Sequence, residues 1–143
     1  MLPTQRTETV LIVDDDEFII EIAGAMLTRH GYRVLSATSG PRALRLLESQ
    51  PHIAIDMALL DIVMPVMDGV ELAIRLGEML PRLPIIFMSS YAENPELRPE
   101  NVRNVQFLAK PFTSVKLANK IREVLDSPPS MFAAVFSSPR RMQ

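Results

Sequence analysis

Short apolar runs and longer amphipathic segments alternate along most of the chain. The first run, residues 10–13, has four consecutive apolar side chains, which at this length is typical of a buried strand. Four later segments carry a similar signal, and we expect strands there as well, at 32–37, 55–60, 84–88 and 105–109. After most of these strands, apolar residues recur at helical spacing, which predicts amphipathic helices in the connections.

Capping residues and helix breakers indicate where the helices begin and end. Gly31 is expected to end the first helix, and Ser39 to open the second. The loop signal of Asp68 and Gly69 precedes the third helix. Thr113 is a good cap for the last one.

Segment 91–103 differs from the other connections, because Pro95 and Pro99 interrupt it. We expect a short or irregular fourth helix there. Strands that alternate with helices are typical of an α/β fold with a parallel sheet. The pattern therefore predicts a single domain over residues 1–126, followed by a Ser/Pro-rich segment, 127–143, that forms a tail or the start of a linker.

Composition and charge narrow the classes of function. The 143 residues include 15 Lys and Arg against 17 Asp and Glu, for a net charge of −2, so no basic field favours direct binding of nucleic acid. The chain has no cysteine, which excludes disulfides and thiolate metal sites. No apolar run approaches the roughly 20 residues of a membrane span, and the start MLPTQRTET lacks a signal-peptide core. We expect a cytoplasmic protein that does not enter a membrane.

Polar side chains with reactive groups stand where the predicted strands end. Asp14 and Asp15 follow the first strand, and Asp61 follows the third. Ser89 and Lys110 follow the fourth and the fifth. In an open parallel sheet, the carboxyl ends of the strands border the crevice in which ligands bind. Two carboxylates about 4 Å apart repel each other by on the order of 4 kcal/mol near a protein surface, so we expect a compensating cation.

Three carboxylates in one crevice make an all-oxygen site of the kind that suits Mg²⁺. A lysine and a hydroxyl beside that metal supply a charge and a hydrogen-bond donor for the oxygens of a phosphoryl group. The pattern therefore predicts a magnesium site that handles phosphoryl groups. Asp16, the last acid of the first run, is expected in an exposed loop or at a helix start instead, and its negative charge is favourable near a helix N-terminus.

Four motifs, taken in order, resemble the receiver domain of two-component response regulators, the family of the bacterial chemotaxis regulator. The motifs are VLIVDDDEF, LLDIVMPVMDG, PIIFMSS and FLAKPF, and the resemblance covers roughly residues 8–126. It implies a doubly wound, flavodoxin-like sheet of five parallel strands in the order 2-1-3-4-5, with helices on both faces.

The resemblance also implies roles for the residues of the crevice. Asp61 matches the aspartate that takes a phosphoryl group from the phosphohistidine of a histidine kinase, or from a small donor such as acetyl phosphate. Asp15 matches the direct Mg²⁺ ligand, Asp14 a ligand that acts through water, and Val63 the residue that lends a backbone carbonyl to the metal. Lys110 matches the lysine that pairs with the acyl phosphate.

Two further positions match residues that transmit phosphorylation in this family. Ser89 matches the switch hydroxyl that moves to the phosphoryl group, and Phe107 matches the aromatic residue that then turns inward. Because Phe107 alternates with its neighbours on a strand, a static core role stays open. The family also has a cis peptide bond at the position of Lys110 and Pro111.

Two features depart from the usual pattern of the family. Val63 replaces a polar residue, and its side chain cannot orient an attacking water, which predicts a changed lifetime of the phosphate. The prolines within 91–103 predict an altered output face.

The function that fits best is a phosphorylation-activated receiver, a switch that catalyses only its own phosphoryl transfer and dephosphorylation. Its expected partners are a histidine kinase or a histidine phosphotransfer protein and a downstream protein target, and a homodimer stays open. One alternative is a Mg²⁺-dependent phosphohydrolase that forms an aspartyl phosphate. Such enzymes carry a second acid two residues after the nucleophile, where this chain has Val63. The other alternative is a binding module with the same fold that is not phosphorylated.

Overall fold

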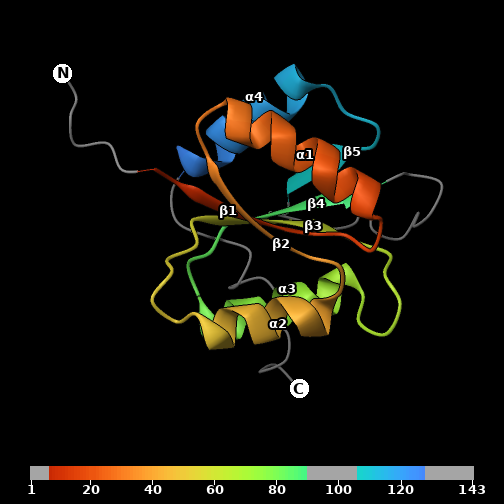
Figure 1. The fold of residues 1–143 in the computed structure, drawn as a ribbon, viewed down its shortest axis with the longest axis vertical. Helices are drawn as coiled ribbons and strands as arrows, with labels where there is room; N and C mark the ends of the chain where they lie inside the picture. The colour runs from red at the N-terminus through yellow and green to blue at the C-terminus, as the bar shows by residue number, and fades with distance from the viewer. Residues whose placement is uncertain (1–6, 90–105, 128–143) are drawn as a thin grey trace, which may run out of the picture.

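Five strands form one parallel sheet in the computed structural model, which describes residues 7–89 and 106–127 (Figure 1). The strands are β1 (Thr9–Val13), β2 (Arg33–Ala37), β3 (Met57–Asp61), β4 (Ile85–Ser89) and β5 (Gln106–Ala109). Their spatial order is β2-β1-β3-β4-β5, and every neighbouring pair is parallel. The predicted fold class and strand order are confirmed, and the strand ends differ from the predicted ones by at most two residues.

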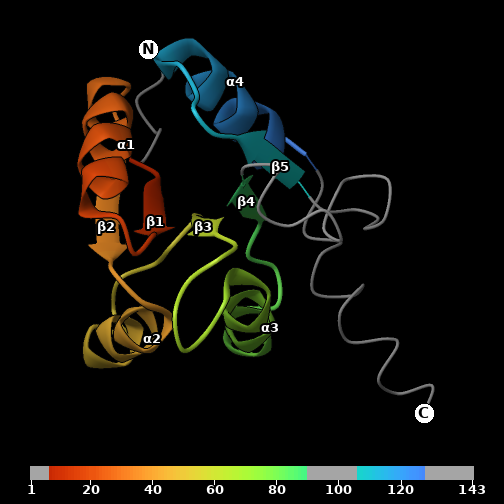
Figure 2. The ribbon, with the colours of Figure 1, turned by 90° about the vertical axis from the view of Figure 1, so that its right-hand side faces the viewer.

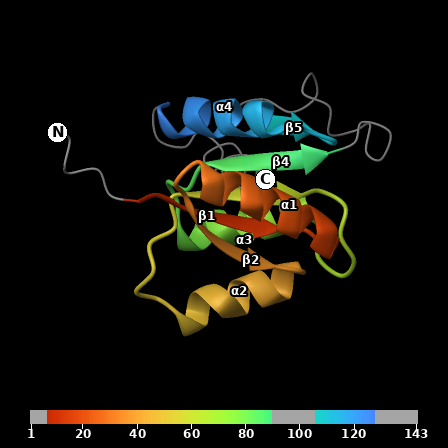
Figure 3. The same cartoon turned by 45° about the horizontal axis from the view of Figure 1, so that its top comes forward.

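The four helices of the described residues cover both faces of the sheet (Figure 2). They are α1 (Glu17–Arg29), α2 (Gly40–Ser49), α3 (Gly69–Met79) and α4 (Ser114–Leu125). Helices α1 and α4 lie on one face and α2 and α3 on the other, and Figure 3 shows α4 beside β5 and β4. None of these helices has the length and apolar character needed to cross a bilayer. The short helix predicted within 91–103, and the segment from 128 onward, lie outside the described residues.

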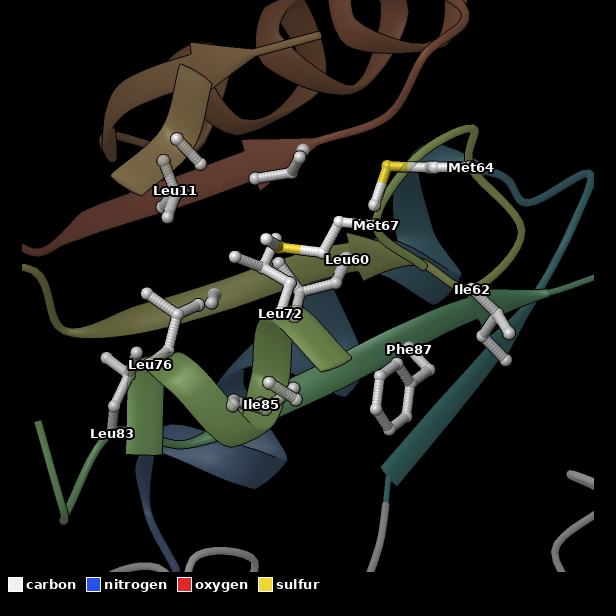
Figure 4. Close-up of a cluster of buried hydrophobic side chains, with 14 of the residues drawn as sticks. Leu11, Leu60, Ile62, Met64, Met67, Leu72, Leu76, Leu83, Ile85 and Phe87 are labelled. Carbon is white, nitrogen blue, oxygen red and sulfur yellow. The ribbon is translucent and has the colours of Figure 1, made fainter. Parts of the chain in front are cut away.

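Two apolar layers hold the helices to the sheet. The layer toward α2 and α3 includes Leu60 of β3 and Leu76 of α3 (Figure 4). The layer toward α1 and α4 includes Ile12, Leu27 and Ile121. Burial of one such side chain contributes roughly 1.5–3 kcal/mol relative to leaving it exposed. Strands β1 and β3 are buried along their whole length, which explains why their sequences are nearly continuous apolar runs.

A side-chain oxygen caps the start of each described helix. Asp16 caps α1 and Asp68 caps α3, with oxygen to backbone nitrogen distances of 2.9 and 2.8 Å. Ser39 and Thr113 cap α2 and α4 at 3.2 and 3.1 Å, as their positions in the sequence predict. Gly31 follows α1 with a φ of 91°, which confirms the predicted helix stop. These caps fix the helix starts next to the carboxyl ends of the strands.

Candidate functional site

The carboxyl ends of neighbouring strands bring the predicted acids together. Val13 of β1 lies opposite Leu60 of β3, so the residues that follow them, Asp14 and Asp61, face each other. Carboxylate oxygens of Asp14, Asp15 and Asp61 all lie within 4.8 Å of one another. This spacing allows one cation to contact all three carboxylates.

Lys110 reaches the same acids from the end of β5. Its Nζ lies 3.0 Å from Asp14 Oδ2 and 3.1 Å from Asp61 Oδ1. Its backbone N–H donates to the carbonyl oxygen of Ser89, at the end of β4, over 2.9 Å. The peptide bond between Lys110 and Pro111 is cis, as the resemblance implies. The ends of β4 and β5 therefore fix the backbone from which the lysine side chain extends.

Asp14 is a fully buried carboxylate whose hydrogen bonding is incomplete. Its Oδ1 accepts a hydrogen bond of 2.8 Å from the backbone N–H of Asp16, just before α1. Its Oδ2 is close to the Lys110 ammonium but accepts no hydrogen bond of good geometry within the described part of the chain. A buried oxygen of this kind, beside two other carboxylates, fits a hard cation such as Mg²⁺. Asp15 is exposed and offers its carboxylate from the solvent side.

Burial changes the protonation of this cluster. Desolvation and the charge of Asp14 raise the pKa of Asp61 from its ordinary value of 3.8 to about 7. Desolvation also raises the pKa of Asp14, by more than the Asp16 hydrogen bond and Lys110 lower it. For Lys110, desolvation lowers the pKa, but the contacts with Asp14 and Asp61 raise it by more, so the ammonium stays charged. Without a metal, the cluster therefore holds a proton near neutral pH.

The stability of the metal-free protein is expected to fall as the pH rises from about 4 to 7. Folded Asp61 keeps its proton up to about pH 7, whereas the unfolded chain releases it near 3.8, so the folded state binds more protons in this range. Added Mg²⁺ is expected to restore stability above pH 7, because a divalent cation favours the ionised carboxylate. Thermal melting at about pH 5 and about pH 8, with EDTA and with Mg²⁺, measures both effects.

Asp61→Asn is the matched control for this measurement, because asparagine does not titrate. The variant should lose most of the difference in melting temperature between the two pH values in EDTA. A wild-type protein that melts at the same temperature at both pH values in EDTA would contradict the expected protonation of Asp61.

Three other residues predicted for the site lie at or beside the same edge. Ser89 is the half-buried last residue of β4, and Val63, two positions after Asp61, has a side chain that is 46% exposed. Phe107 lies opposite Phe87 and packs against its ring, with 5.8 Å between the centroids and 43° between the planes. Phe107 is thus a partly buried residue that packs against the core. The switch roles of Ser89 and Phe107, and the metal contact of Val63, stay predictions.

The sequence pattern marks Gly69 only as part of a loop signal, whereas the structure places it beside the site. Its backbone N–H donates to the carbonyl oxygen of Ile62 over 2.7 Å. A Cβ atom at this position would overlap the backbone oxygen of Asp61. The first turn of α3 can therefore press against the end of β3 only because this residue has no side chain. The sequence feature that could have indicated this close approach is an Asp-Gly pair soon after a strand that ends in an acid.

The β3–α3 loop combines two buried methionines with one strained residue. Met64 and Met67 anchor the loop in the apolar layer (Figure 4). Between them, Val66 is 93% exposed and has a φ of 73°. A β-branched residue in the left-handed region is strained by about 1–2 kcal/mol, and its exposed side chain gains little from packing.

Val66→Gly is expected to raise the free energy of unfolding by about 1 kcal/mol, because glycine adopts a positive φ without strain. Val63→Gly in the same loop is the control, since no positive φ is found at Val63. The control is expected to destabilise the protein through the extra freedom of glycine in the unfolded chain. Urea denaturation measures the free energy of unfolding of both variants. A lower value for Val66→Gly than for the wild-type protein would contradict the claim that Val66 is strained.

Comparison with known proteins agrees with this geometry. The family model of the response regulator receiver domain matches residues 10–122. The response regulator receiver protein CpdR of Brucella abortus is 34% identical over 119 residues, covering 81% of this chain and 95% of CpdR. The sensor kinase CckA of Brucella abortus is 36% identical over 120 residues, covering 82% of this chain but 12% of CckA. The transcriptional regulatory protein GlrR of Escherichia coli is 30% identical over 118 residues, covering 82% of this chain and 26% of GlrR.

Two similar solved structures are described as receiver domains. A receiver domain protein from Methanospirillum hungatei has 30% sequence identity and a TM-score of 0.71, covering 85% of this chain and 95% of that one. The receiver domain of the hybrid histidine kinase CckA has 30% identity and a TM-score of 0.68, covering 82% and 99%. The family match over most of the chain and the nearly full-length match to CpdR lead to one conclusion: the chain belongs to the response regulator receiver domain family of two-component systems.

Proposed function

We propose that this chain is a phosphorylation-activated receiver that accepts a phosphoryl group on Asp61. The observation that carries the proposal is the convergence of three carboxylates and one lysine from separate strands around a buried oxygen, Asp14 Oδ2, with incomplete hydrogen bonding. The donor is the phosphohistidine of a histidine kinase or of a histidine phosphotransfer protein.

In this proposal, Asp15 and Asp61 would hold Mg²⁺ together with the backbone carbonyl of Val63, and Asp14 would support the metal through water. The metal supplies the positive charge that allows a phosphoryl group to approach the carboxylates. An ionised Asp61 oxygen attacks the phosphorus atom while the bond from phosphorus to the donor imidazole breaks. The bonding electrons leave with the imidazole, and the product is an acyl phosphate. Lys110, already 3.1 Å from Asp61 Oδ1, donates to an oxygen of the transferred group.

The proposed readout is a change of packing at β4 and β5. Ser89 ends β4, which is the neighbour of the strand that carries Asp61, and this position supports a role for its hydroxyl in meeting the phosphoryl group. Phe107 already contacts Phe87, and its ring follows the movement of Ser89. The two arrangements present different surfaces, which changes the affinity for a downstream protein.

The named relatives support a role in signalling without fixing the partners of this chain. One is named a sensor kinase, one a transcriptional regulatory protein and one a receiver protein. The matched segment is a small part of the first two and nearly the whole of the third. A receiver of this kind therefore occurs with different output partners, and the downstream protein of this chain is to be sought by its preference for the phosphorylated form.

Incubation with acetyl phosphate and Mg²⁺, followed by intact mass measurement, tests the proposed function. One adduct of about 80 Da per chain is expected, and EDTA should prevent it. Digestion after trapping the acyl phosphate should place the adduct on the peptide that contains Asp61. An adduct on another peptide would contradict the assignment of the acceptor.

Two other outcomes would favour the alternative functions. Repeated turnover of a phosphate monoester, with many cycles per protein molecule, would favour a phosphohydrolase. No adduct from acetyl phosphate and none from a phosphorylated histidine kinase would favour a binding module that is not phosphorylated.

A further inference from the structure

The β3–α3 loop, residues 62–68, is closed at its base by one hydrogen bond. The backbone N–H of Gly69 donates to the carbonyl oxygen of Ile62 over 2.7 Å. Asp61 precedes this base, and Val63, which the family resemblance makes a metal ligand through its backbone carbonyl, follows it. The Val63 side chain is exposed, so its own packing does little to orient the backbone. The direction of its carbonyl therefore depends on how the rest of the loop is held.

Met67 joins the far side of this loop to the apolar layer below the sheet. Its side chain is buried and belongs to the same layer as Ala43 and Leu47 of α2, and Figure 4 shows it pointing from the loop into that layer. Its backbone N–H donates to the carbonyl oxygen of Pro65 over 2.7 Å, which closes a tight turn around Val66. Met67 thus contributes to the turn with its backbone and to the core with its side chain.

The space that Met67 occupies exists because α2 begins with a glycine. A Cβ atom at Gly40 would lie 2.5 Å from Met67 Sδ, 3.0 Å from its Cγ and 3.1 Å from its Cβ. Nonbonded carbon atoms pack at about 3.5–4.0 Å, so all three contacts would be too short. The Cβ and Cγ atoms of Met67 are close to its backbone, and a rotation of the end of the side chain does not move them. A methyl group at Gly40 therefore displaces Met67 as a whole.

The backbone at Gly40 does not itself require a glycine. Among the glycines of the described residues, a positive φ is found at Gly31 and not at Gly40. The start of α2 is capped by Ser39, which accepts a hydrogen bond from the N–H of Arg42 over 3.2 Å. Alanine fits such a helix start and is a better helix former than glycine. The packing of Met67 is thus the feature of this structure that needs a residue without a side chain here.

We propose that Met67, packed on Gly40, is a positioning residue for the metal-binding loop. Its contact with the start of α2 holds the loop in the shape from which the backbone carbonyl of Val63 reaches the metal. The inference rests on the proposed function, which assigns Mg²⁺ to this edge of the sheet. Met67 touches neither the metal nor the phosphoryl group, and it gives α2, which carries none of the proposed site residues, an indirect part in metal binding.

The strained residue of the loop explains why such a contact is needed. Val66 has a φ of 73°, which a β-branched residue disfavours, and its side chain is exposed. Once Met67 leaves its place on α2, the turn is free to open and Val66 returns to a negative φ. The opening changes the path of the loop three residues after Val63. The packing of Met67 therefore opposes a relaxation that would move the metal-binding backbone.

Gly40→Ala tests the proposal, because it displaces Met67 without removing any group of the site. Mg²⁺ binding, measured by calorimetric titration at about pH 8, is expected to weaken by about tenfold, as when the support of a metal ligand is lost. Gly24→Ala adds the same methyl group to α1, where the nearest atom is a methyl group of Val34 at 3.8 Å. This control should bind Mg²⁺ as the wild-type protein does.

Two substitutions of Met67 test the same contact from the other side. Met67→Ala removes the side chain that packs on Gly40 and is expected to weaken Mg²⁺ binding by about tenfold. Met67→Leu keeps a side chain of similar volume at this place and should retain most of the affinity. Leu76→Val, a truncation of a fully buried residue of the same layer, is expected to lower the melting temperature and leave the affinity unchanged.

Hydrogen exchange in EDTA measures the loop without any metal. The amides of Met67 and Gly69 each donate a hydrogen bond of 2.7 Å within the loop. Gly40→Ala is expected to speed their exchange by about tenfold relative to the amides of β3, which lie in the centre of the sheet. Equal exchange in Gly40→Ala and the wild-type protein would show that Met67 does not hold the loop, which overturns the proposal.

The titrations distinguish a failure of this inference from a failure of the proposed function. A wild-type protein that binds no Mg²⁺ would overturn the proposed function as a whole. Binding by the wild-type protein together with equally tight binding by Gly40→Ala and Met67→Ala would overturn the positioning role alone. A Leu76→Val protein that loses as much affinity as Gly40→Ala would also overturn it, since general loss of stability would then explain the effect.

Discussion

Asp61→Asn is expected to abolish the mass gain of about 80 Da that acetyl phosphate and Mg²⁺ produce in the wild-type protein. The amide oxygen of asparagine carries no full negative charge, so it neither attacks phosphorus nor binds the metal as a carboxylate does. Lys110 Nζ, 3.1 Å from Asp61 Oδ1, would face a neutral group instead of an anion. Both the nucleophile and part of the metal site are lost in one substitution.

Asp68→Asn is the matched control for this experiment. Asp68 belongs to the same β3–α3 loop, is exposed, and accepts a hydrogen bond of 2.8 Å at the start of α3. Asparagine caps helices about as well as aspartate, so this variant should fold and keep the full mass gain. A full gain in Asp61→Asn would show that another residue accepts the phosphoryl group.

Loss of folding would be a poor explanation for an inactive Asp61→Asn protein. Burial and the neighbouring charge of Asp14 raise the pKa of Asp61 to about 7, so a charged carboxylate is disfavoured at this position in the absence of metal. A neutral amide of the same shape removes that repulsion. The variant is therefore expected to melt at a higher temperature than the wild-type protein in EDTA near pH 8, and the melting curve separates folding from chemistry.

The convergence of the site could be predicted because parallel strands share the direction of their carboxyl ends. Asp61 and Lys110 are 49 positions apart, and yet each directly ends or follows a strand, so strand signals alone place both at one edge. The order of the strands came from the resemblance to a family, since the pattern of apolar residues does not say which strands are neighbours. The contact between Asp14 and Asp61 depends on β1 lying next to β3.

Features that depend on backbone geometry could not be predicted in the same way. Nothing in the identity of Val66 indicates a positive φ, because a β-branched residue disfavours it. The angle accompanies a tight turn in which the backbone N–H of Met67 donates to the carbonyl oxygen of Pro65 over 2.7 Å. The orientation of Asp14 by the backbone of Asp16 likewise appears only once the helix start is placed. Local propensity is overridden at these positions by the fixed ends of β3 and the following helix.

Gly69→Ala is expected to lower the free energy of unfolding by about 3 kcal/mol, because the added methyl group overlaps the backbone oxygen of Asp61. The neighbours in this case are backbone atoms of Asp61 and Ile62, which cannot move aside as a flexible side chain can. The clash is relieved only if the start of α3 moves away from β3. That movement breaks the 2.7 Å hydrogen bond from Gly69 to the carbonyl of Ile62.

Gly24→Ala is the matched control, since it adds the same methyl group to a glycine in another helix. The nearest atom to a Cβ at Gly24 is a methyl group of Val34, 3.8 Å away, which is an ordinary contact. Alanine in the interior of α1 is expected to stabilise the protein by roughly 0.5–1 kcal/mol. Urea denaturation should thus show a lower free energy of unfolding for Gly69→Ala and a higher one for Gly24→Ala, although both substitutions add the same methyl group.

The same pair of variants links the packing of α3 to the chemistry of the site. If Gly69→Ala stays folded, the start of α3 moves away from β3 and no longer packs against the backbone of Asp61. The carboxylate of Asp61 is then held less firmly beside Asp14 and Lys110, and the rate of phosphorylation by acetyl phosphate should fall by about tenfold or more. Gly24→Ala should leave that rate unchanged, because the added methyl group meets Val34 of β2 and none of the residues of the site. A Gly69→Ala protein with wild-type stability and a wild-type rate would show that the close approach of α3 to β3 is not what positions the acceptor.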